Sequence, residues 1–469
     1  MKVELLEHNG ITVRTHFFPC EFKPENGKVP KLAIVSAYDC LCGIAEYTYF
    51  LVQSLKKFAD VTVIELDQDT FKYPQNMARE DAEKQLSVIC DQLGKFDAVN
   101  LQFEPGTLGH SAKAAYKRLT KIVDASPSIS VTFHTFLNDV KESRGFWKEF
   151  RKLRFITAFF GRSKSRSRYY LTSKPIQYLK QAGESKNVTF IVHTKREVER
   201  LVRIYRVPRE NAFDHPLAFM NPELTNNLKP SKMKASLNLP SDSVVMGIFG
   251  FISPYKGTDL AVEVMRLLPK NYHLLIAGGL HPNEAKAHTT DVHPYLNSIL
   301  RNILGKGQPP EKSKKRPTDA PEPKIDSEKL IDRVHFLGAQ DRDEFLSLMN
   351  DCDVVLLPYR EVGQTSSGPI SMAVEMKKRV IASRTEAFAE FAKYYPNRLE
   401  QFDQNNFVEL SQRVRAPQQL EETEQQISWL TNVKTYFDAH QFAPVTEAQR
   451  DKCLESMAPI HIHEDRQAA

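Results

Sequence analysis

A lysine at the tip of a loop is the first candidate for chemistry in the sequence. Lys256 ends the run Gly250-Phe-Ile-Ser-Pro-Tyr-Lys256, which joins an apolar segment to a helical pattern. An ammonium group at such a turn can neutralise a diphosphate. The alternative is an ordinary surface lysine. Because Gly250 and Ser253 lie in the same loop, we include them with Lys256 in a predicted phosphate-binding site.

A second loop with suitable donors begins at Glu361, about 100 residues further along the chain. It leads into another helical pattern, and hydroxyl and free backbone N–H groups at a helix start can bind phosphate oxygens. The residues that we assign to this loop are Gln364, Ser366, Ser367 and Gly368. Either loop alone is weak evidence, but two anion-suited loops in one half of the chain together predict a phosphate site.

Three loops in the first half of the chain are candidates for contact with a ligand. Gly43 precedes a helical pattern whose free N–H groups suit an anion, although a tight turn alone would explain it. Glu104 either binds sugar hydroxyls or caps the next helix, and His134 either binds a ligand or is a packing residue. The pair Cys40 and Cys42 lacks a matching Cys or His pair, so we predict no metal site.

These loops follow short apolar runs that read as buried strands, with helical patterns between many of them. The expected strands cover residues 31–36, 61–66, 97–103, 129–134, 187–194, 244–252, 272–279, 333–338, 353–359 and 379–383. Strands that alternate with helices predict parallel sheets with right-handed crossovers. Ligands of such sheets bind beyond the carboxyl ends of the strands, where the candidate residues lie. The fold class is therefore α/β, with two Rossmann-like domains.

The domain boundaries follow from the alternation and its interruptions. We expect an N-terminal domain over 1–217 whose ordered part begins near Lys31, a linker over 218–240, and a C-terminal domain over 241–400. The second domain carries an insertion over 281–330, of which the proline-rich stretch 306–329 reads as a solvated loop. Residues 401–469 form a helical extension and a disordered tail, and an amphipathic helix in the extension could return to the first domain.

Composition excludes several classes of protein. The 469 residues are 41% hydrophobic and 26% charged, which is typical of a globular chain. No apolar run approaches the ~20 residues that cross a bilayer. The N-terminal segment lacks an apolar signal core, and six cysteines do not make a disulfide framework in so long a chain. We therefore expect a cytoplasmic protein.

The net charge of +6 is unevenly distributed. Residues 141–180 contain 12 Lys and Arg against 2 Glu, whereas the rest holds 52 basic and 56 acidic residues. Aromatic residues accompany the basic ones, which suits peripheral contact with an anionic membrane at its inner face. The alternative is a core-packing helix with a solvated basic face. A nucleic-acid partner is disfavoured because no recognised motif accompanies the charge.

Several motifs recur in the order and spacing of a known family. They are Tyr255-Lys256-Gly257-Thr-Asp259, Leu274-Leu-Ile-Ala-Gly278-Gly279, Val334-His-Phe-Leu-Gly338 and Val380-Ile-Ala382, with Gly43-Ile-Ala-Glu-Tyr and Thr132-x-His134 in the first half. On these residues the chain resembles the family 4 (group 1) glycosyltransferases, which have the GT-B fold. The resemblance spans about residues 31–385 and is strongest over 244–383.

The resemblance implies transfer of a sugar from a nucleotide-diphosphate donor to a glycan or lipid-linked acceptor, with retention at the anomeric carbon and without a metal cofactor. It implies that the donor occupies the C-terminal domain and the acceptor the N-terminal one. Lys256 and Ser366, Ser367 and Gly368 would stabilise the leaving diphosphate, which Gly43 would approach, and Gly278 and Gly338 would border the donor. His134 would contact the sugar, with Glu104 on the acceptor side.

Three positions depart from the family pattern. Phe251 stands where many members have an Arg, and Gln364 and Met372 stand where many have a pair of Glu. Glu361, three residues before Gln364, is a substitute for the first Glu and is included among the catalytic candidates. The departures motivate an alternative function, a non-catalytic relative that binds a sugar nucleotide or a glycan.

Overall fold

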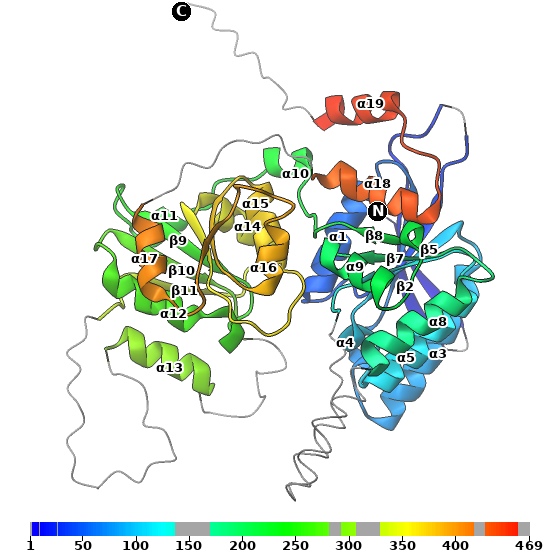
Figure 1. Cartoon of the computed structure of the whole chain (residues 1–469), viewed down its shortest axis with the longest axis horizontal. Coiled ribbons are helices and arrows are strands. Elements are labelled where there is room, and N and C mark those ends of the chain that lie inside the picture. Colours follow the sequence, from blue (N-terminus) through cyan, green and yellow to red (C-terminus); the bar gives the residue numbers. More distant parts are fainter. Residues whose placement is uncertain are drawn as a thin grey trace, which may run out of the picture. The chain divides into compact units, whose positions relative to one another are not determined.

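The computed structural model describes residues 2–8, 10–25, 27–136, 169–280, 292–305, 329–416 and 427–457. The chain divides into two compact units (Figure 1). The first unit comprises Met1–Glu223, Gln364–Gly368 and Ile427–Ala469, and the second comprises Leu224–Gly363 and Pro369–Gln426. Each unit is built on one β-sheet, and both sheets consist mainly or entirely of parallel strands. The predicted α/β fold with two Rossmann-like domains is therefore confirmed.

The sheet of the first unit has eight strands in the order β1-β2-β4-β3-β5-β6-β7-β8. They are β1 (Lys2–His8), β2 (Ile11–Phe18), β3 (Lys31–Ser36), β4 (Asp60–Glu65), β5 (Ala98–Phe103), β6 (Ile129–Phe133), β7 (Val188–Val192) and β8 (Ala212–Asp214). From β4 to β8 all neighbours are parallel. Strands β5, β6 and β7 are fully buried, as parallel strands covered on both faces must be.

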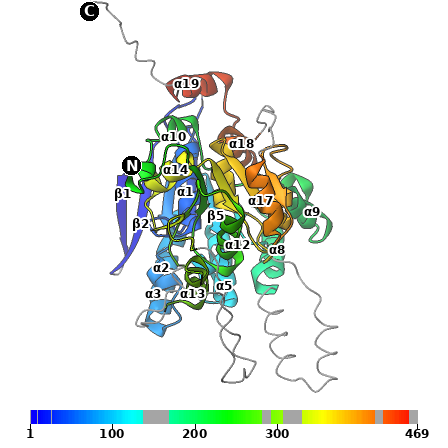
Figure 2. The same ribbon diagram turned by 90° about the vertical axis from the view of Figure 1, so that its left-hand side faces the viewer.

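The helices of this unit come from its N-terminal segment and from the end of the chain. They are α1 (Gly43–Leu55), α2 (Gln68–Phe71), α3 (Asn76–Leu93), α4 (Pro105–Leu108), α5 (Ala112–Ala125), α8 (Lys174–Ala182), α9 (Lys195–Arg203), α18 (Trp429–His440) and α19 (Glu447–Met457), with short η1 (Tyr169–Ser173) and η2 (Arg209–Asn211). Side chains fix several helix starts: Ser111 caps α5, and Thr194 with Glu197 forms a capping box on α9. Helices α3 and α5 lie side by side (Figures 1 and 2).

The second unit has a six-stranded sheet in the order β11-β10-β9-β12-β13-β14, and every pair in it is parallel. Its strands are β9 (Val244–Phe249), β10 (Tyr272–Ala277), β11 (Val334–Gly338), β12 (Val354–Leu357), β13 (Arg379–Ser383) and β14 (Glu400–Phe402). Its helices are α11 (Met233–Ser236), α12 (Thr258–Val264), α13 (Pro294–Ile303), α14 (Arg342–Asp351), α15 (from Gly368 to Glu375), α16 (Glu386–Phe391) and α17 (Phe407–Arg415), with η3 (Pro254–Lys256) and η4 (Met265–Leu267).

Strand order reverses once in each unit among the parallel strands. In the first unit β3 lies between β4 and β5, and in the second β9 lies between β10 and β12. The loops after two adjacent strands then leave in opposite directions, which opens a crevice at the carboxyl ends of the strands. The loops after β3 and β5, and those after β9 and β12, are therefore the positions where each sheet is built to take a ligand.

The beginning of the chain differs from the prediction. An antiparallel hairpin, β1 and β2, precedes Lys31, and β2 also pairs antiparallel with β4 through Thr15 opposite Ile64. Val3 and Leu5 of β1 are 47% and 59% exposed. An edge strand without a buried face carries little of the hydrophobic signal on which strand prediction depends, so the expected start near Lys31 was too late.

The C-terminal extension expected over 401–469 is divided between the units. Strand β14 and helix α17 complete the second unit, whereas α18 and α19 belong to the first. The expected linker 218–240 contains α10 (Pro222–Asn226) and α11. Part of the expected insertion is the helix α13, which packs against α12.

Several predictions concern segments that lie partly or wholly outside the described residues. They are the basic segment up to residue 168, the proline-rich stretch up to residue 328 and the tail from residue 458. No helix in the described part is both long enough and apolar enough to span a membrane.

Candidate functional site

Lys256 lies at the point of strand reversal in the second unit, in the turn η3 after β9. Its side chain is buried, and its ammonium group donates to the phenol oxygen of Tyr359 at 2.8 Å and to the Phe249 carbonyl at 3.4 Å. Burial lowers the pKa of Lys256, because a charged group is less stable away from water. No carboxylate forms an ion pair with it in the described part of the chain. A buried ammonium without a counter-ion is suited to an anionic ligand.

Two glycines allow the lysine and the neighbouring loop to approach closely. Gly250 has φ +96°, and a Cβ added there would lie 2.8 Å from Nζ of Lys256. Gly278, at the end of β10, has φ +158°, and its Cβ would lie 2.0 Å from the Gly250 carbonyl oxygen. A side chain at Gly278 would displace the backbone of the loop after β9, and one at Gly250 would displace the ammonium group of Lys256. Both positions also have a positive φ, which favours glycine.

Three hydroxyl groups of the second unit are buried without a hydrogen-bond partner in the described structure, two of them within three residues of Lys256 in the sequence. They belong to Ser253, Thr258 and Ser371, which are 4%, 1% and 1% exposed. Ser253 begins the turn η3, Thr258 begins α12, and Ser371 lies in the first turns of α15. Buried hydroxyls are normally hydrogen-bonded, so those without partners are candidates for contact with a ligand.

Two other predicted residues of the second unit have different environments. The Glu361 carboxylate accepts hydrogen bonds from the backbone N–H groups of Gly363, at 2.8 Å, and Glu386, at 2.7 Å. It therefore stabilises its own loop and the start of α16. Gly338 ends the edge strand β11, where φ is +73° and an added Cβ would meet nothing within 4 Å. Gly338 therefore lies two strands away from β9, not at the strand reversal.

The loop Gln364–Gly368 belongs to the first unit, whereas the prediction put it in one domain with Lys256. Thr365 explains the difference, because its hydroxyl donates to the backbone carbonyl of His134 at 3.1 Å. Gln364 donates to the Ser366 carbonyl at 2.5 Å, which fixes the local turn. The hydroxyl of Ser367, a residue that is 6% exposed, has no partner in the described structure. Thr365 was not predicted, because nothing in the sequence of a loop indicates a contact 231 residues away.

His134 directly follows β6, and both of its ring nitrogens lie near protein partners. Its Nε2 lies 2.7 Å from Oε1 of Gln102, and its Nδ1 lies 3.3 Å from Nε2 of His193. Burial, followed by the neighbouring His193, lowers the pKa of His134 well below its ordinary value. The imidazole is therefore neutral at physiological pH, and direct contact with a ligand requires it to exchange one of these partners.

Glu104 lies beside His134 because β5 and β6 are adjacent strands. The backbone N–H of His134 donates to the carbonyl of Phe103, and Glu104 accepts a hydrogen bond from Thr135 at 2.6 Å. Burial raises the pKa of Glu104. Its side chain does not cap α4, so of the two predicted roles helix capping is not observed. The structure thus brings Glu104, His134 and Thr365 together.

Gly43 is the first residue of α1, in the loop after β3. The Sγ atom of Cys42 accepts a hydrogen bond from the backbone N–H of Ala45 at 3.3 Å and caps the helix. A Cβ added at Gly43 would meet nothing within 4 Å, so the loop is open at this point. Cys40 lies beside Cys42, with their sulfur atoms 3.7 Å apart. Among the described residues, no group of three or more side chains is arranged to hold a metal ion.

A network of buried polar side chains next to His134 was not predicted. Asn100 and Gln102 of β5 and Thr132 of β6 form hydrogen bonds among themselves and with Tyr436 of α18, whose hydroxyl lies 3.1 Å from Thr132 Oγ1. Two amide side chains within the buried strand Ala98–Phe103 were the available signal. A polar residue in such a strand needs a partner, and here the partner comes from the end of the chain.

The comparisons with known proteins agree with this geometry. Two Rossmann-like units define the GT-B fold of glycosyltransferases, and the described chain has that fold. The family model described as glycosyl transferases group 1 matches residues 231–427, which include most of the second unit. This match supports a group 1 glycosyltransferase. A search of curated protein sequences finds no significant match.

Solved structures resemble the chain over nearly its whole length. HepE from Anabaena, solved with UDP and glucose, is 14% identical with a TM-score of 0.51, and the match covers 92% of this chain and 100% of HepE. Sucrose-phosphate synthase from Thermosynechococcus elongatus is 15% identical with a TM-score of 0.52, covering 91% and 99%. The UDP-forming α,α-trehalose-phosphate synthase of Burkholderia xenovorans is 11% identical with a TM-score of 0.50, covering 91% and 99%. At these identities the likeness establishes the fold.

Proposed function

We propose that the chain is a retaining, family 4 glycosyltransferase that moves a sugar from a nucleotide-diphosphate donor to a glycan or lipid-linked acceptor. The observation that carries the proposal is the buried ammonium group of Lys256, which has no carboxylate partner in the described structure and lies where the second sheet reverses its strand order. UDP and UDP-glucose in the solved structures of HepE support a nucleotide sugar as the donor.

The leaving diphosphate is the group that such a site must stabilise. In the proposal, Lys256 and the hydroxyl of Ser253 in the second unit bind its phosphate oxygens. Ser366, Ser367 and Gly368 are proposed phosphate-binding residues through their hydroxyl and backbone N–H groups. Donors fixed in advance stabilise developing charge without reorganising, which is the main source of catalysis in such transfers. Glu104, after β5 at the strand reversal of the first unit, and His134, after the neighbouring strand β6, are the proposed acceptor residues.

The proposed reaction needs no metal, since Lys256 supplies a positive charge and the backbone N–H groups at the start of α15 supply a partial one. Activity that persists after treatment with a chelator is therefore expected. We also propose a cytoplasmic location, with residues 141–180 as the segment for peripheral contact with an anionic membrane.

A second candidate function is a non-catalytic relative that binds the sugar nucleotide. Met372 favours it, because this residue occupies the position of the second family Glu and is a buried core residue on α15 that is 4% exposed. Glu361 does not replace the family pair by its geometry, since its carboxylate is engaged by backbone N–H groups of Gly363 and Glu386.

The test measures nucleotide binding before activity. Isothermal titration calorimetry with UDP, GDP, ADP and UDP-glucose is applied to the wild type, to Lys256→Met and to Lys270→Met. Methionine fills the buried space of Lys256 without its charge, so the variant is expected to fold and to lose nucleotide binding by more than tenfold. Lys270 is an exposed lysine of the same unit and serves as the matched control.

The outcomes separate the two functions. Nucleotide binding together with transfer of the sugar to an acceptor supports the transferase. The anomeric configuration of the product tests retention. Binding without transfer or donor hydrolysis selects the non-catalytic alternative. If folded Lys256→Met binds nucleotide as tightly as the wild type, the assignment of the site is wrong.

A further inference from the structure

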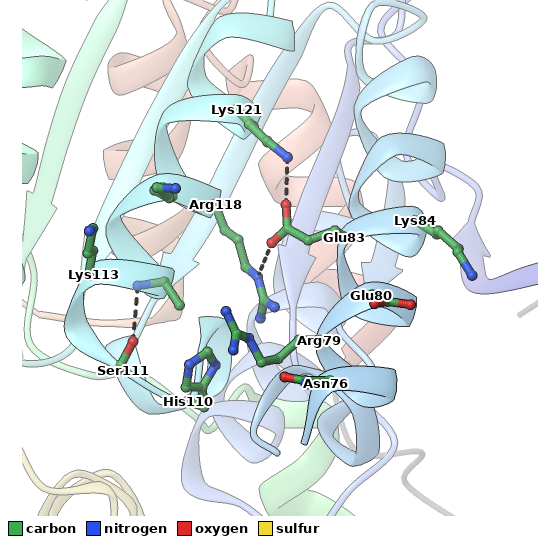
Figure 3. Close-up of a pocket in the computed structure, with 12 residues that line it drawn as sticks. Asn76, Arg79, Glu80, Glu83, Lys84, His110, Ser111, Lys113, Arg118 and Lys121 are labelled. Atoms are coloured by element: carbon green, nitrogen blue, oxygen red, sulfur yellow. Dashed lines mark hydrogen bonds and ion pairs between the residues drawn. The ribbon is translucent and has the colours of Figure 1, made fainter. Parts of the chain in front are cut away.

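A basic groove runs between α3 and α5 in the first unit, apart from the residues discussed above (Figure 3). It encloses a volume of about 830 Å³ and is open to solvent. The first half of α3 lines one side, and the loop before α5 and the part of α5 up to Lys121 line the other. The lining residues are Asn76, Arg79, Glu80, Glu83, Lys84, His110, Ser111, Lys113, Ala114, Lys117, Arg118 and Lys121. Six of these side chains are cationic and two are carboxylates.

One of the two carboxylates, Glu83, forms ion pairs with two of the cations. Glu83 accepts a hydrogen bond from Nε of Arg118 at 2.9 Å and from Lys121 at 2.6 Å (Figure 3). Burial opposes ionisation of Glu83, but Lys121 and Arg118 outweigh it and lower the pKa of Glu83. Arg118 is 2% exposed, and its guanidinium also donates to the carbonyl oxygens of Phe71 and Leu108. Because two cations share this one carboxylate, Glu83, Arg118 and Lys121 together keep a net positive charge at the groove.

Three other cations have no ion pair in the described part of the chain. Arg79 projects from α3, and Lys113 and Lys117 project from α5. Lys113, Lys117 and Lys121 are spaced by four residues and so share one face of α5. Like charges at this spacing destabilise a helix. Of this row, Lys113 and Lys117 have no ion pair in the described part of the chain, and both line the groove together with Arg79 of α3. An anion bound between these three cations would relieve their mutual repulsion.

His110 adds a neutral polar group at the same place. Burial, followed by Arg79 and Arg118, lowers the pKa of His110, so the ring is uncharged at neutral pH. Its Nδ1 atom is buried without a hydrogen-bond partner in the described structure. In Figure 3 the His110 ring lies beside the Arg79 guanidinium at the end of the groove near Ser111. A protonated phosphate oxygen or a hydroxyl of a ligand would satisfy this atom.

We propose that this groove binds the phosphate groups of an anionic ligand that carries at least two negative charges. Arg79, Lys113 and Lys117 contact the phosphate oxygens, and Arg118 supplies a fixed charge beneath them. A guanidinium group and two ammonium groups at one position match the charge and the donor requirement of a diphosphate or a phosphate monoester. The phosphate can belong to a soluble molecule or to a lipid headgroup, because the recognition chemistry is the same.

The experiment uses one probe for each source of phosphate. Inorganic pyrophosphate is titrated into the full-length protein by calorimetry, and flotation is measured with vesicles of phosphatidylcholine containing phosphatidic acid or of phosphatidylcholine alone. All proteins carry Lys256→Met, so that pyrophosphate binding at the proposed donor site does not contribute. The test variant is Arg79→Gln with Lys117→Gln, and the control is Lys95→Gln with Lys270→Gln, which removes the same charge at exposed positions outside the groove.

Binding of either probe should fall at least about tenfold in the test variant, remain in the control, and weaken as salt is added. Pyrophosphate binding identifies a soluble ligand, and binding only to the phosphatidic acid vesicles identifies a lipid. If neither probe binds, or if the test and control variants lose affinity equally, the proposal is wrong. The groove does not involve Lys256, so this result and the nucleotide-binding result are independent of each other.

Discussion

The ammonium group of Lys256 donates a hydrogen bond to the phenol oxygen of Tyr359 over 2.8 Å. The same ammonium lies 4.9 Å from the centre of the Tyr359 ring. Tyr359 follows β12, and Lys256 follows β9, so this contact joins the two loops at the strand reversal of the second unit. It holds the ammonium group in place while leaving it without a neutralising carboxylate in the described structure. The contact therefore positions Nζ of Lys256 at the strand reversal, where an anionic ligand would supply the missing counter-ion and favour the charged form of the lysine.

Removal of the Tyr359 hydroxyl should destabilise the second unit and weaken nucleotide binding. In Tyr359→Phe the ring remains, but a buried ammonium loses a partner, which costs about 1–3 kcal/mol. The loss further lowers the pKa of Lys256, because the hydrogen bond favours the charged form. Urea unfolding measures the stability, and calorimetry with UDP measures the binding.

Tyr395→Phe is the matched control for this substitution. The Tyr395 hydroxyl is buried and has no hydrogen-bond partner in the described structure, so its removal should leave stability unchanged or increase it. Equal losses of stability in the two variants would show that the Lys256–Tyr359 hydrogen bond contributes nothing beyond packing.

Replacement of Lys377 by glycine should stabilise the protein. Lys377 lies two residues after the end of α15 and has φ +57°, in the left-handed region that costs a residue with a Cβ about 1–2 kcal/mol. Glycine removes this strain and loses part of the gain through the greater entropy of the unfolded chain, so a net increase of about 0.5–1 kcal/mol is expected. Lys377→Ala keeps the strain and should show no gain. If Lys377→Ala stabilised the protein as much as Lys377→Gly, relief of backbone strain at residue 377 would not explain the gain in stability.

The sequence predicted the two sheets because parallel strands are buried on both faces and appear as continuous apolar runs. The strands at 31–36, 129–133 and 379–383 lie where these runs lie. The loops that bear Lys256, Glu104 and His134 were likewise predictable, because the carboxyl end of each strand follows directly from the run.

What the sequence could not predict depends on contacts between distant segments. Thr365 reaches the His134 carbonyl, and Tyr436 reaches Thr132 across 304 residues. Neither contact follows from local periodicity, because each is set by the packing of a loop or of α18 onto the first sheet. The environment of Glu361 was unpredictable for the same reason, since its carboxylate bonds the start of α16.

Acid should unfold the first unit through its buried neutral histidines. Burial lowers the pKa values of His193 and His215 from 6.5 to about 4, and that of His440 to about 3. The unfolded chain binds protons to these groups first, so their contribution to stability is present above pH 6.5 and is lost as the pH falls through 4. Glu197 acts in the opposite sense, because burial raises its pKa from 4.5 to about 7 and its stabilising effect grows as the pH falls through that range.

His440→Gln tests this linkage at one residue. His440 contacts the hydroxyl of Ser130 at 2.9 Å, and glutamine can keep that contact without titrating. Below pH 6.5 the variant should lose up to about 1.4 kcal/mol less stability per pH unit than the wild type. Urea unfolding followed by the fluorescence of buried Trp429, in a Trp147→Phe background, reports on the first unit. Identical pH dependence in wild type and variant would contradict the prediction.

Cys42 should be the most reactive thiol among the described cysteines. A hydrogen bond from Cys40, and then those from backbone N–H groups of Ala45 and Ile44, lower the pKa of Cys42 to about 6 against the effect of burial. The thiolate is the nucleophile, so alkylation by iodoacetamide should rise with pH around a midpoint near 6. Buried Cys352, whose pKa burial raises to about 12, is the internal control and should stay unmodified. Peptide mass spectrometry measures both sites in one sample.

Cys40→Ala separates the contribution of the pair from that of the helix start. Without the Cys40 donor, the alkylation midpoint of Cys42 should move upward toward the ordinary thiol value of about 8.5, while the backbone N–H groups of α1 keep it below that value. A midpoint that does not change in Cys40→Ala would show that the helix start alone activates Cys42. A wild-type midpoint near the ordinary value would contradict the prediction altogether, because then neither the neighbouring thiol nor α1 stabilises the thiolate.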